Sequence, residues 1–162
     1  METNERKAQL LDEIRRTHGE LGAVLAPLTE AQMTEAQMTQ PGVNGEWSAK
    51  DTLAHITWWE GHMLRTLRSG QEELEPEGSN PETLTRQKNA EVFAANRGRP
   101  LAEVRAEFET TYQEVLAALE GWPAEALAQD VTYEAIGWDT FKHYPEHTAA
   151  IREWLARGGP AR

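Results

Sequence analysis

The sequence contains no cysteine, so it can form no disulfide framework, thiolate metal site or cysteine nucleophile. Any metal ion must therefore be held by histidine, aspartate or glutamate. No apolar run approaches the roughly 20 residues that a membrane span needs, so we expect no membrane partner. The N-terminus, METNERKAQLLDE, carries both signs of charge before any apolar stretch, which argues against a secretory signal peptide. These absences fit a cytoplasmic protein.

Basic residues are also scarce. The chain has 16 lysines and arginines against 27 aspartates and glutamates, for a net charge of −11. Phosphate backbones are bound by clustered lysine and arginine side chains, and no stretch holds such a cluster. We therefore expect no nucleic-acid partner and attribute the acidity to solubility. At 162 residues, with 39% hydrophobic and 27% charged residues, the chain fits a single soluble domain spanning residues 1–162.

Helical periodicity, interrupted by proline and glycine, is the dominant pattern. Apolar residues recur at spacings of three and four, and no stretch predicts a convincing strand. The predicted helices span about residues 4–26, 49–69, 82–96, 100–121 and 138–157, the third being the short one. Ser48, with Asp51 three residues later, resembles a capping box that opens the second helix. The fold class is therefore all-α, a bundle of four main helices plus one short helix.

The remaining stretches read as connections. The unit TEAQM occurs twice in residues 29–38, and five residues match neither the helix nor the strand period. We interpret it as a local duplication in a helical turn or loop. Residues 39–46, TQPGVNGE, are rich in turn formers, and residues 70–81 form an acidic linker.

Two of the five histidines, His143 and His147, lie four residues apart. On a helix this spacing places their side chains about 40° apart on one face, where two imidazoles can bind one ion. Exposed histidines, or hydrogen-bonded core histidines, would show the same spacing. His55 changes the balance because it lies in a largely buried helix, where a lone histidine needs a partner. Three imidazoles from two facing helices form the arrangement of catalytic metal sites with one open position.

The other two histidines are interpreted differently. His62 lies about 10 Å from His55 along the same helix, too far to share an ion, so it lines the pocket mouth or is simply exposed. His18 occupies the apolar stripe of the first helix and is interpreted as a packed, hydrogen-bonded histidine.

Pro145 lies between the paired histidines, and a proline inside a helix removes a backbone hydrogen bond. In one placement Asp139 caps a helix whose sixth residue is Pro145, which implies a kink. In the other, Lys142 is the last non-helical residue and His143 starts the helix, where the first amides have no intrahelical partner. In both placements the two histidines face one side.

Two segments resemble a known family. The run PGVNGEWSAKDTLAHITWWE, residues 41–60, resembles the second-helix region of the DinB/YfiT-like superfamily, and its EWS opening is most similar to the ClbS/DfsB branch. HYPEH is similar to the paired histidines on the last main helix of that superfamily. The resemblance implies a four-helix bundle in up-down-down-up order with a long crossover. It also implies a nickel or zinc ion on His55, His143 and His147, although some branch members lack the first of these, and Pro145 departs from the pattern.

The superfamily includes thiol-dependent transferases and isomerases, and its ClbS-like branch is linked with resistance to a DNA-alkylating metabolite through opening of a cyclopropane. We therefore favour a metal-dependent enzyme, of hydrolase or thiol-transferase type, acting on a small electrophilic molecule in stress or toxin resistance. A thiol nucleophile would have to come from a low-molecular-weight thiol. Two alternatives stay open: a metal-free small-molecule-binding or self-resistance module of the ClbS/DfsB type, and an interaction protein that pairs as a homodimer.

Several other side chains are weaker candidates. Tyr144, Glu60 and Asp51 could support the site or move protons, but we expect Asp51 to cap its helix and Glu60 to meet solvent. Three tryptophans, Trp58, Trp59 and Trp138, could wall an apolar pocket or simply pack in the core. Metal affinity is expected to fall as the pH drops through the histidine range near 6.5.

Overall fold

The computed structural model describes residues 2–35, 38–39, 46–70, 78 and 80–158. Over these residues the protein is all-α apart from one pair of two-residue strands. In chain order the elements are α1 (Glu2–Leu25), α2 (Glu30–Thr34), β1 (Met38–Thr39), β2 (Glu46–Trp47), α3 (Ala49–Ser69), α4 (Pro81–Asn96), α5 (Leu101–Gly121), α6 (Ala124–Leu127), α7 (Asp130–Asp139) and α8 (His143–Ala156). None of the described helices is long and apolar enough to cross a membrane.

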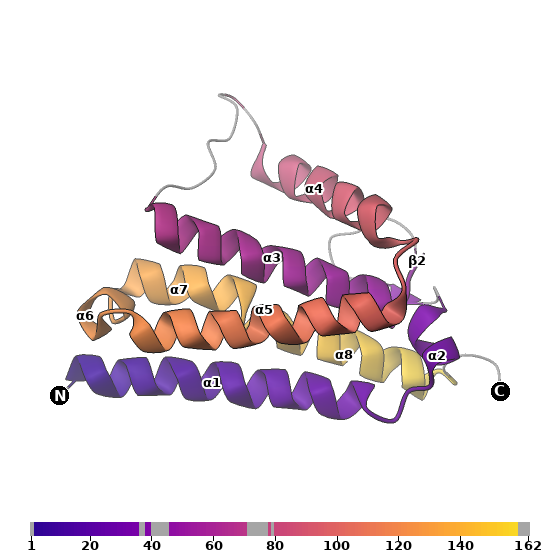
Figure 1. Ribbon diagram of the computed structural model, residues 1–162, viewed down its shortest axis with the longest axis horizontal. Coiled ribbons are helices and arrows are strands. Elements are labelled where there is room, and N and C mark those ends of the chain that lie inside the picture. The colour runs from indigo at the N-terminus through magenta and orange to yellow at the C-terminus, as the bar shows by residue number, and fades with distance from the viewer. Residues whose placement is uncertain (1, 36–37, 40–45, 71–77, 79, 159–162) are drawn as a thin grey trace.

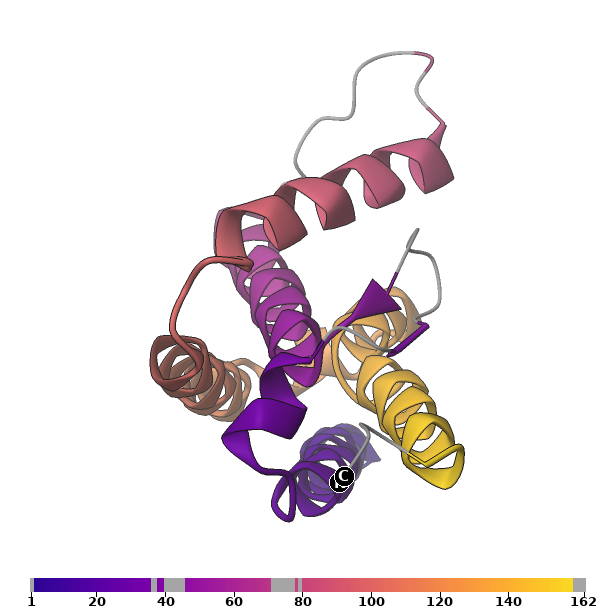
Figure 2. The ribbon, with the colours of Figure 1, turned by 90° about the vertical axis from the view of Figure 1, so that its right-hand side faces the viewer.

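The long helices lie side by side, and α4 is set apart from them (Figures 1 and 2). Helices α3 and α5 run in one direction, whereas α1, α7 and α8 run in the opposite direction (Figure 1). Helix α3 packs chiefly on α5, and α1 on α8, while α4 covers the outer side of α3. The fully buried apolar side chains between these helices include Leu10, Ile14, Leu21, Leu53, Ile56, Val115, Leu119, Ile136 and Ile151.

The prediction of an all-α protein is confirmed, and the helix at residues 49–69 has the predicted bounds. Its start is the predicted capping box. The backbone N–H of Asp51 donates to Ser48 Oγ at 3.1 Å, and the backbone N–H of Ser48 donates to Asp51 Oδ2 at 2.8 Å. Each group satisfies an amide that the first turn leaves unpaired, so Asp51 caps its helix as expected.

The predicted number of helices is wrong, because residues 124–139 form two further helices, α6 and α7, and the last helix begins at His143 instead of residue 138. The expected absence of strands is also wrong: β1 and β2 form a short antiparallel pair with Met38 opposite Trp47. The first copy of the TEAQM unit forms α2, capped by Thr29. Residues 36–37 of the second copy, residues 40–45 of the predicted loop and most of the linker at 70–81 lie outside the described residues.

A sharp turn between α7 and α8 determines where the helix that carries His143 and His147 begins. The backbone N–H groups of Thr140 and Lys142 both donate to the carbonyl of Gly137, at 3.2 and 2.9 Å. A Cβ atom at Gly137 would lie 2.7 Å from the ring of Phe141, so a larger residue does not fit there without a shift. Helix α8 therefore starts anew after Lys142. Pro145 is its third residue, where the missing N–H costs no helical hydrogen bond, so the second of the two predicted placements is confirmed.

Candidate metal centre

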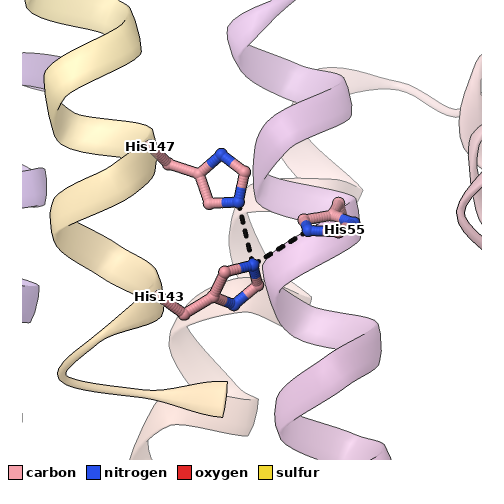
Figure 3. A group of neighbouring side chains, drawn as sticks. All are labelled: His55, His143 and His147. Atoms are coloured by element: carbon pink, nitrogen blue, oxygen red, sulfur yellow. Dashed lines mark hydrogen bonds between the residues drawn. The ribbon is translucent and has the colours of Figure 1, made fainter. Parts of the chain in front are cut away.

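Helices α3 and α8 bring the three predicted histidines to one point, with their rings facing one another (Figure 3). The Nε2 atom of His143 lies 2.9 Å from Nε2 of His55 and 2.9 Å from Nε2 of His147. One ring nitrogen of each histidine lies within 4.8 Å of the others. His55 and His147 are 5% and 2% exposed, and His143 retains more exposed surface at the pocket described below. The three side chains therefore form one compact group of imidazoles.

Local structure holds each ring in place. His55 lies in the middle of α3, where the rings of Trp47 and Trp59 flank it in T-shaped contacts at centroid distances of 5.2 and 6.4 Å. Trp47 belongs to the EWS segment, so β2 and the capped start of α3 together place an aromatic wall against this histidine. His143 is the first residue of α8, and His147 follows one turn later on the same face.

Burial lowers the pKa of all three histidines. It takes the pKa of His143 to about 4. For His55 and His147 the pKa is well below 6.5, first because of burial and then because a positive charge on a neighbouring histidine would repel theirs. A hydrogen bond with Asn89 acts on His55 in the opposite direction. The rings are therefore neutral at neutral pH, the state in which imidazole binds metal, and the expected loss of affinity near pH 6.5 shifts to more acidic pH.

The donor set fits a divalent transition metal. Imidazole nitrogens lie about 2.0–2.1 Å from zinc, so two of them in a tetrahedron lie about 3.3 Å apart. The observed contacts of 2.9 Å are within a few tenths of an ångström of that separation. Nitrogen ligands of this type suit zinc and nickel. The Nδ1 atom of His143 is buried without a hydrogen-bond partner in the described structure, so the ring contacts alone do not satisfy this histidine.

A pocket of about 420 Å³ opens onto the three histidines. Besides them it is lined by Trp59, Thr85, Asn89, Trp138, Asp139 and Glu146. Of the three tryptophans considered from the sequence, Trp59 and Trp138 line the pocket and Trp58 does not. The indole N–H of Trp59 donates to Asn89 Oδ1 at 2.9 Å, which joins α3 to α4. Burial raises the pKa of Asp139 to about 7.

Sequence reasoning missed four of these lining residues. Thr85 and Asn89 lie on α4, and only the packing of α4 over α3 places them at the pocket. The sequence suggests Asp139 only as a helix cap, whereas it is the last residue of α7. Glu146 directly precedes His147 in HYPEH, and this position is the sequence signal that could have identified it as a pocket residue.

The other two histidines lie elsewhere. The ring of His18 stacks on Tyr112 with 3.4 Å between centroids, and its Nε2 is buried without a hydrogen-bond partner in the described structure. His18 is therefore packed, as predicted, but its Nε2 makes no hydrogen bond. His62 stacks on Trp58 at a centroid distance of 5.4 Å and does not line the pocket.

The expectation that Glu60 meets solvent is wrong. Its side chain is fully buried, and its Oε1 accepts a hydrogen bond from the hydroxyl of Tyr144, which is also fully buried, at 2.5 Å. Burial raises the pKa of Glu60 to about 8, although the hydrogen bond from Tyr144 acts in the opposite direction. Neither residue lines the pocket.

An all-α fold with three buried, converging histidines defines the class of protein. The family model of the DinB superfamily matches residues 31–154. The chain therefore belongs to the DinB superfamily, as its resemblance implied. No curated protein matches the chain in sequence.

Solved structures share the fold at low sequence identity. An uncharacterised protein from Escherichia coli UTI89 has a TM-score of 0.79 at 16% identity, with 96% of each chain covered. The colibactin self-resistance protein ClbS, in complex with double-stranded DNA, has a TM-score of 0.79 at 14% identity, covering 93% of this chain and 95% of ClbS. DfsB, a sibling lethal factor precursor, has a TM-score of 0.75 at 18% identity, covering 96% of this chain and 98% of DfsB. These similarities establish the fold alone.

Proposed function

We propose that the protein is a metal-dependent enzyme, of hydrolase or thiol-transferase type, that acts on a small electrophilic molecule and serves in stress or toxin resistance. The observation that carries this proposal is the convergence of His55, His143 and His147 on the wall of a 420 Å³ pocket. We also infer that α1, α3, α5 and the interrupted pair α7–α8 are the four helices of an up-down-down-up bundle in one domain, with α4 in the long crossover.

The three histidines would hold one divalent ion, zinc or nickel, as neutral imidazoles. Three protein ligands are typical of catalytic sites, which keep one position open. When bound, such an ion acts as a Lewis acid and makes a nucleophile available at neutral pH. Because the chain has no cysteine, a thiol nucleophile would come from a low-molecular-weight thiol.

The pocket residues have complementary roles in this proposal. Trp59 and Trp138 offer apolar surface to the organic part of the substrate and keep water from it. The carboxyl of Asp139, with a pKa of about 7 caused by burial, can accept a proton near neutral pH, as a general base must. Asn89 orients Trp59 through the hydrogen bond that it accepts.

The first test is metal content. Protein purified without a histidine tag should contain, or take up in equilibrium titration, one zinc or nickel ion per chain. Loaded protein should then consume small epoxides or alkyl halides, with water or an added low-molecular-weight thiol as nucleophile, and a His55→Ala variant should not. Wild-type protein that stays empty with both metals in excess would refute the proposal.

A second candidate is a metal-free module that binds a small molecule or confers self-resistance. The two contacts of 2.9 Å that His143 Nε2 makes with the other rings favour it, because they are hydrogen bonds that pair ring nitrogens of the histidines with one another. The shared fold with ClbS and DfsB agrees with it. Metal-free protein would then bind an electrophile tightly and stoichiometrically, and removal of metal with a chelator would leave that binding unchanged.

We propose further that duplex DNA is not a partner of this chain. Binding to DNA is a property of the ClbS structure, and the net charge of −11 opposes it here. A mobility-shift titration at physiological salt should show no retardation. Tight binding that weakens as salt is added would contradict this proposal and reveal a local basic surface.

A further inference from the structure

A buried hydrogen bond joins the two helices that carry the three histidines. The hydroxyl of Tyr144 on α8 donates to Oε1 of Glu60 on α3 at 2.5 Å, and both side chains are fully buried. Tyr144 lies between His143 and His147 in the sequence, and Glu60 follows His55 by five residues, about 7.5 Å along the helix. The bond is therefore anchored within two turns of every histidine in the group.

Packing alone does not account for a glutamate at this position. A carboxyl is among the groups most costly to bury, and an apolar side chain of similar size would fill the space more favourably. The second oxygen of Glu60, Oε2, is buried without a hydrogen-bond partner among the described residues. Glu60 and Tyr144 are also absent from the pocket lining, so neither is placed to touch a substrate there.

The geometry points to a role in orientation. His143 and His147 occupy one face of α8, and rotation of α8 about its axis would move both rings together, away from His55. Tyr144 projects from the same turn of α8 as His143, about 100° around the axis. A hydrogen bond persists only while its donor–acceptor distance changes by no more than a few tenths of an ångström. A fixed contact from Tyr144 to α3 therefore restrains that rotation. Residues that orient metal ligands in this way affect affinity without touching the ion.

We propose that the Glu60–Tyr144 hydrogen bond is a positioning device that holds α8 against α3 at the rotation in which His55, His143 and His147 converge on one divalent cation. The inference rests on the proposed metal site and deepens it. Glu60 and Tyr144 are positioning residues, and the ion is reached only through the histidines.

The test is equilibrium titration with zinc. Tyr144→Phe keeps the ring and removes the donor, and Glu60→Leu removes the acceptor. Each should weaken zinc affinity about tenfold, in the range seen when partners that orient a metal ligand are removed. The double variant should bind no more weakly than the weaker single variant, because both changes break one bond. Glu60→Gln retains an acceptor oxygen and should stay within about threefold of wild type.

Tyr133→Phe is the matched control. The hydroxyl of Tyr133 donates to Glu13 Oε2 at 3.0 Å and joins α7 to α1, neither of which carries a member of the histidine group. This variant loses the same kind of hydrogen bond at a distance from the site. Its zinc affinity should equal that of wild type.

Cobalt(II) supplies a readout that simple loss of stability would not change. The visible absorption of bound cobalt depends on the arrangement of its ligands. Measured well below the unfolding temperature, the band should shift in Tyr144→Phe and stay in place in Tyr133→Phe and Glu60→Gln. If Tyr144→Phe does not fold, the contrast between Glu60→Gln and Glu60→Leu carries the same test.

The outcomes separate the two proposals. Wild type that binds neither zinc nor nickel would refute the metal site and the positioning role together. Wild-type affinity and an unshifted cobalt band in Tyr144→Phe would refute the positioning role and leave the metal site intact.

Discussion

The three clustered histidines of this protein and His18 all have a lowered pKa but differ in their surroundings. His55, His143 and His147 present Nε2 atoms to one another between α3 and α8. His18 on α1 instead lies flat against Tyr112. Burial lowers the pKa of both His143 and His18 to about 4. A lowered histidine pKa therefore reports burial alone, whereas the convergence of several ring nitrogens is what distinguishes a candidate metal centre.

The largest expected effect is on metal stoichiometry. Each of the variants His55→Ala, His143→Ala and His147→Ala should lose stoichiometric binding of zinc or nickel in equilibrium titration, because two imidazoles do not complete the site. His18→Ala and His62→Ala should retain one ion per chain. Circular dichroism would verify that each variant is folded. If His18→Ala lost the metal as well, the distinction between His18 and the three clustered histidines would be wrong.

The next effect is on the pH dependence of stability in metal-free protein. The four histidines with lowered pKa, the three at the site and His18, are neutral when folded, while the unfolded chain binds protons below pH 6.5. Their contribution is present above pH 6.5 and is lost as the pH falls towards 4. Glu60 and Asp139 act in the opposite sense, since burial raises their pKa to about 8 and about 7. Their contribution is fully present below the ordinary pKa values of 4.5 and 3.8, and it is lost as the pH rises from there through about 8 and about 7.

These opposing contributions predict a maximum of stability near pH 6.5. Each group changes the free energy of unfolding by up to ~1.4 kcal/mol per pH unit, and below pH 6.5 the four histidines outnumber the two carboxyls. Urea unfolding at pH 5, 6.5 and 8 would measure the effect. Stability that is constant over this range would show that these groups are not buried as described.

A smaller effect is expected when His18 is made apolar. His18→Phe should raise the free energy of unfolding by ~1 kcal/mol, because it removes a buried nitrogen that lacks a hydrogen-bond partner. It should also reduce the loss of stability between pH 6.5 and 5, since one fewer group takes up a proton on unfolding. A clear destabilisation at pH 7 would mean that the imidazole makes an interaction that stacking on Tyr112 does not explain.

Pro145→Ala should have the smallest effect. A proline in mid-helix costs up to ~3 kcal/mol, but Pro145 is the third residue of α8 and displaces no helical hydrogen bond. Alanine there should lower stability by ~0.4–1 kcal/mol, because it frees the unfolded chain. Zinc affinity should stay within about twofold of wild type. A stabilised variant, or one with weaker zinc binding, would show that the proline strains α8 or sets the angle between His143 and His147.

The sequence by itself determined the features that depend on neighbouring residues. The bounds of α3 follow from its apolar period and from the Ser48–Asp51 cap, both of which operate within one or two helical turns. The spacing of His143 and His147 likewise places two imidazoles on one face of any helix that contains them. The segments EWS and HYPEH were enough to indicate the DinB superfamily.

Only the tertiary structure decided how these local elements meet. His55 and His143 are 88 residues apart, and Glu60 and Tyr144 are 84 apart, so no local pattern specifies either contact. The break before α8 depends on the ring of Phe141 packing over Gly137, which helical periodicity does not register. Glutamate is a residue type that usually lies at the surface, yet Glu60 is buried where Tyr144 of α8 meets it. The physical reason is the same in each case: burial and convergence are set by packing between helices, and that packing is a sum over contacts distant in the sequence.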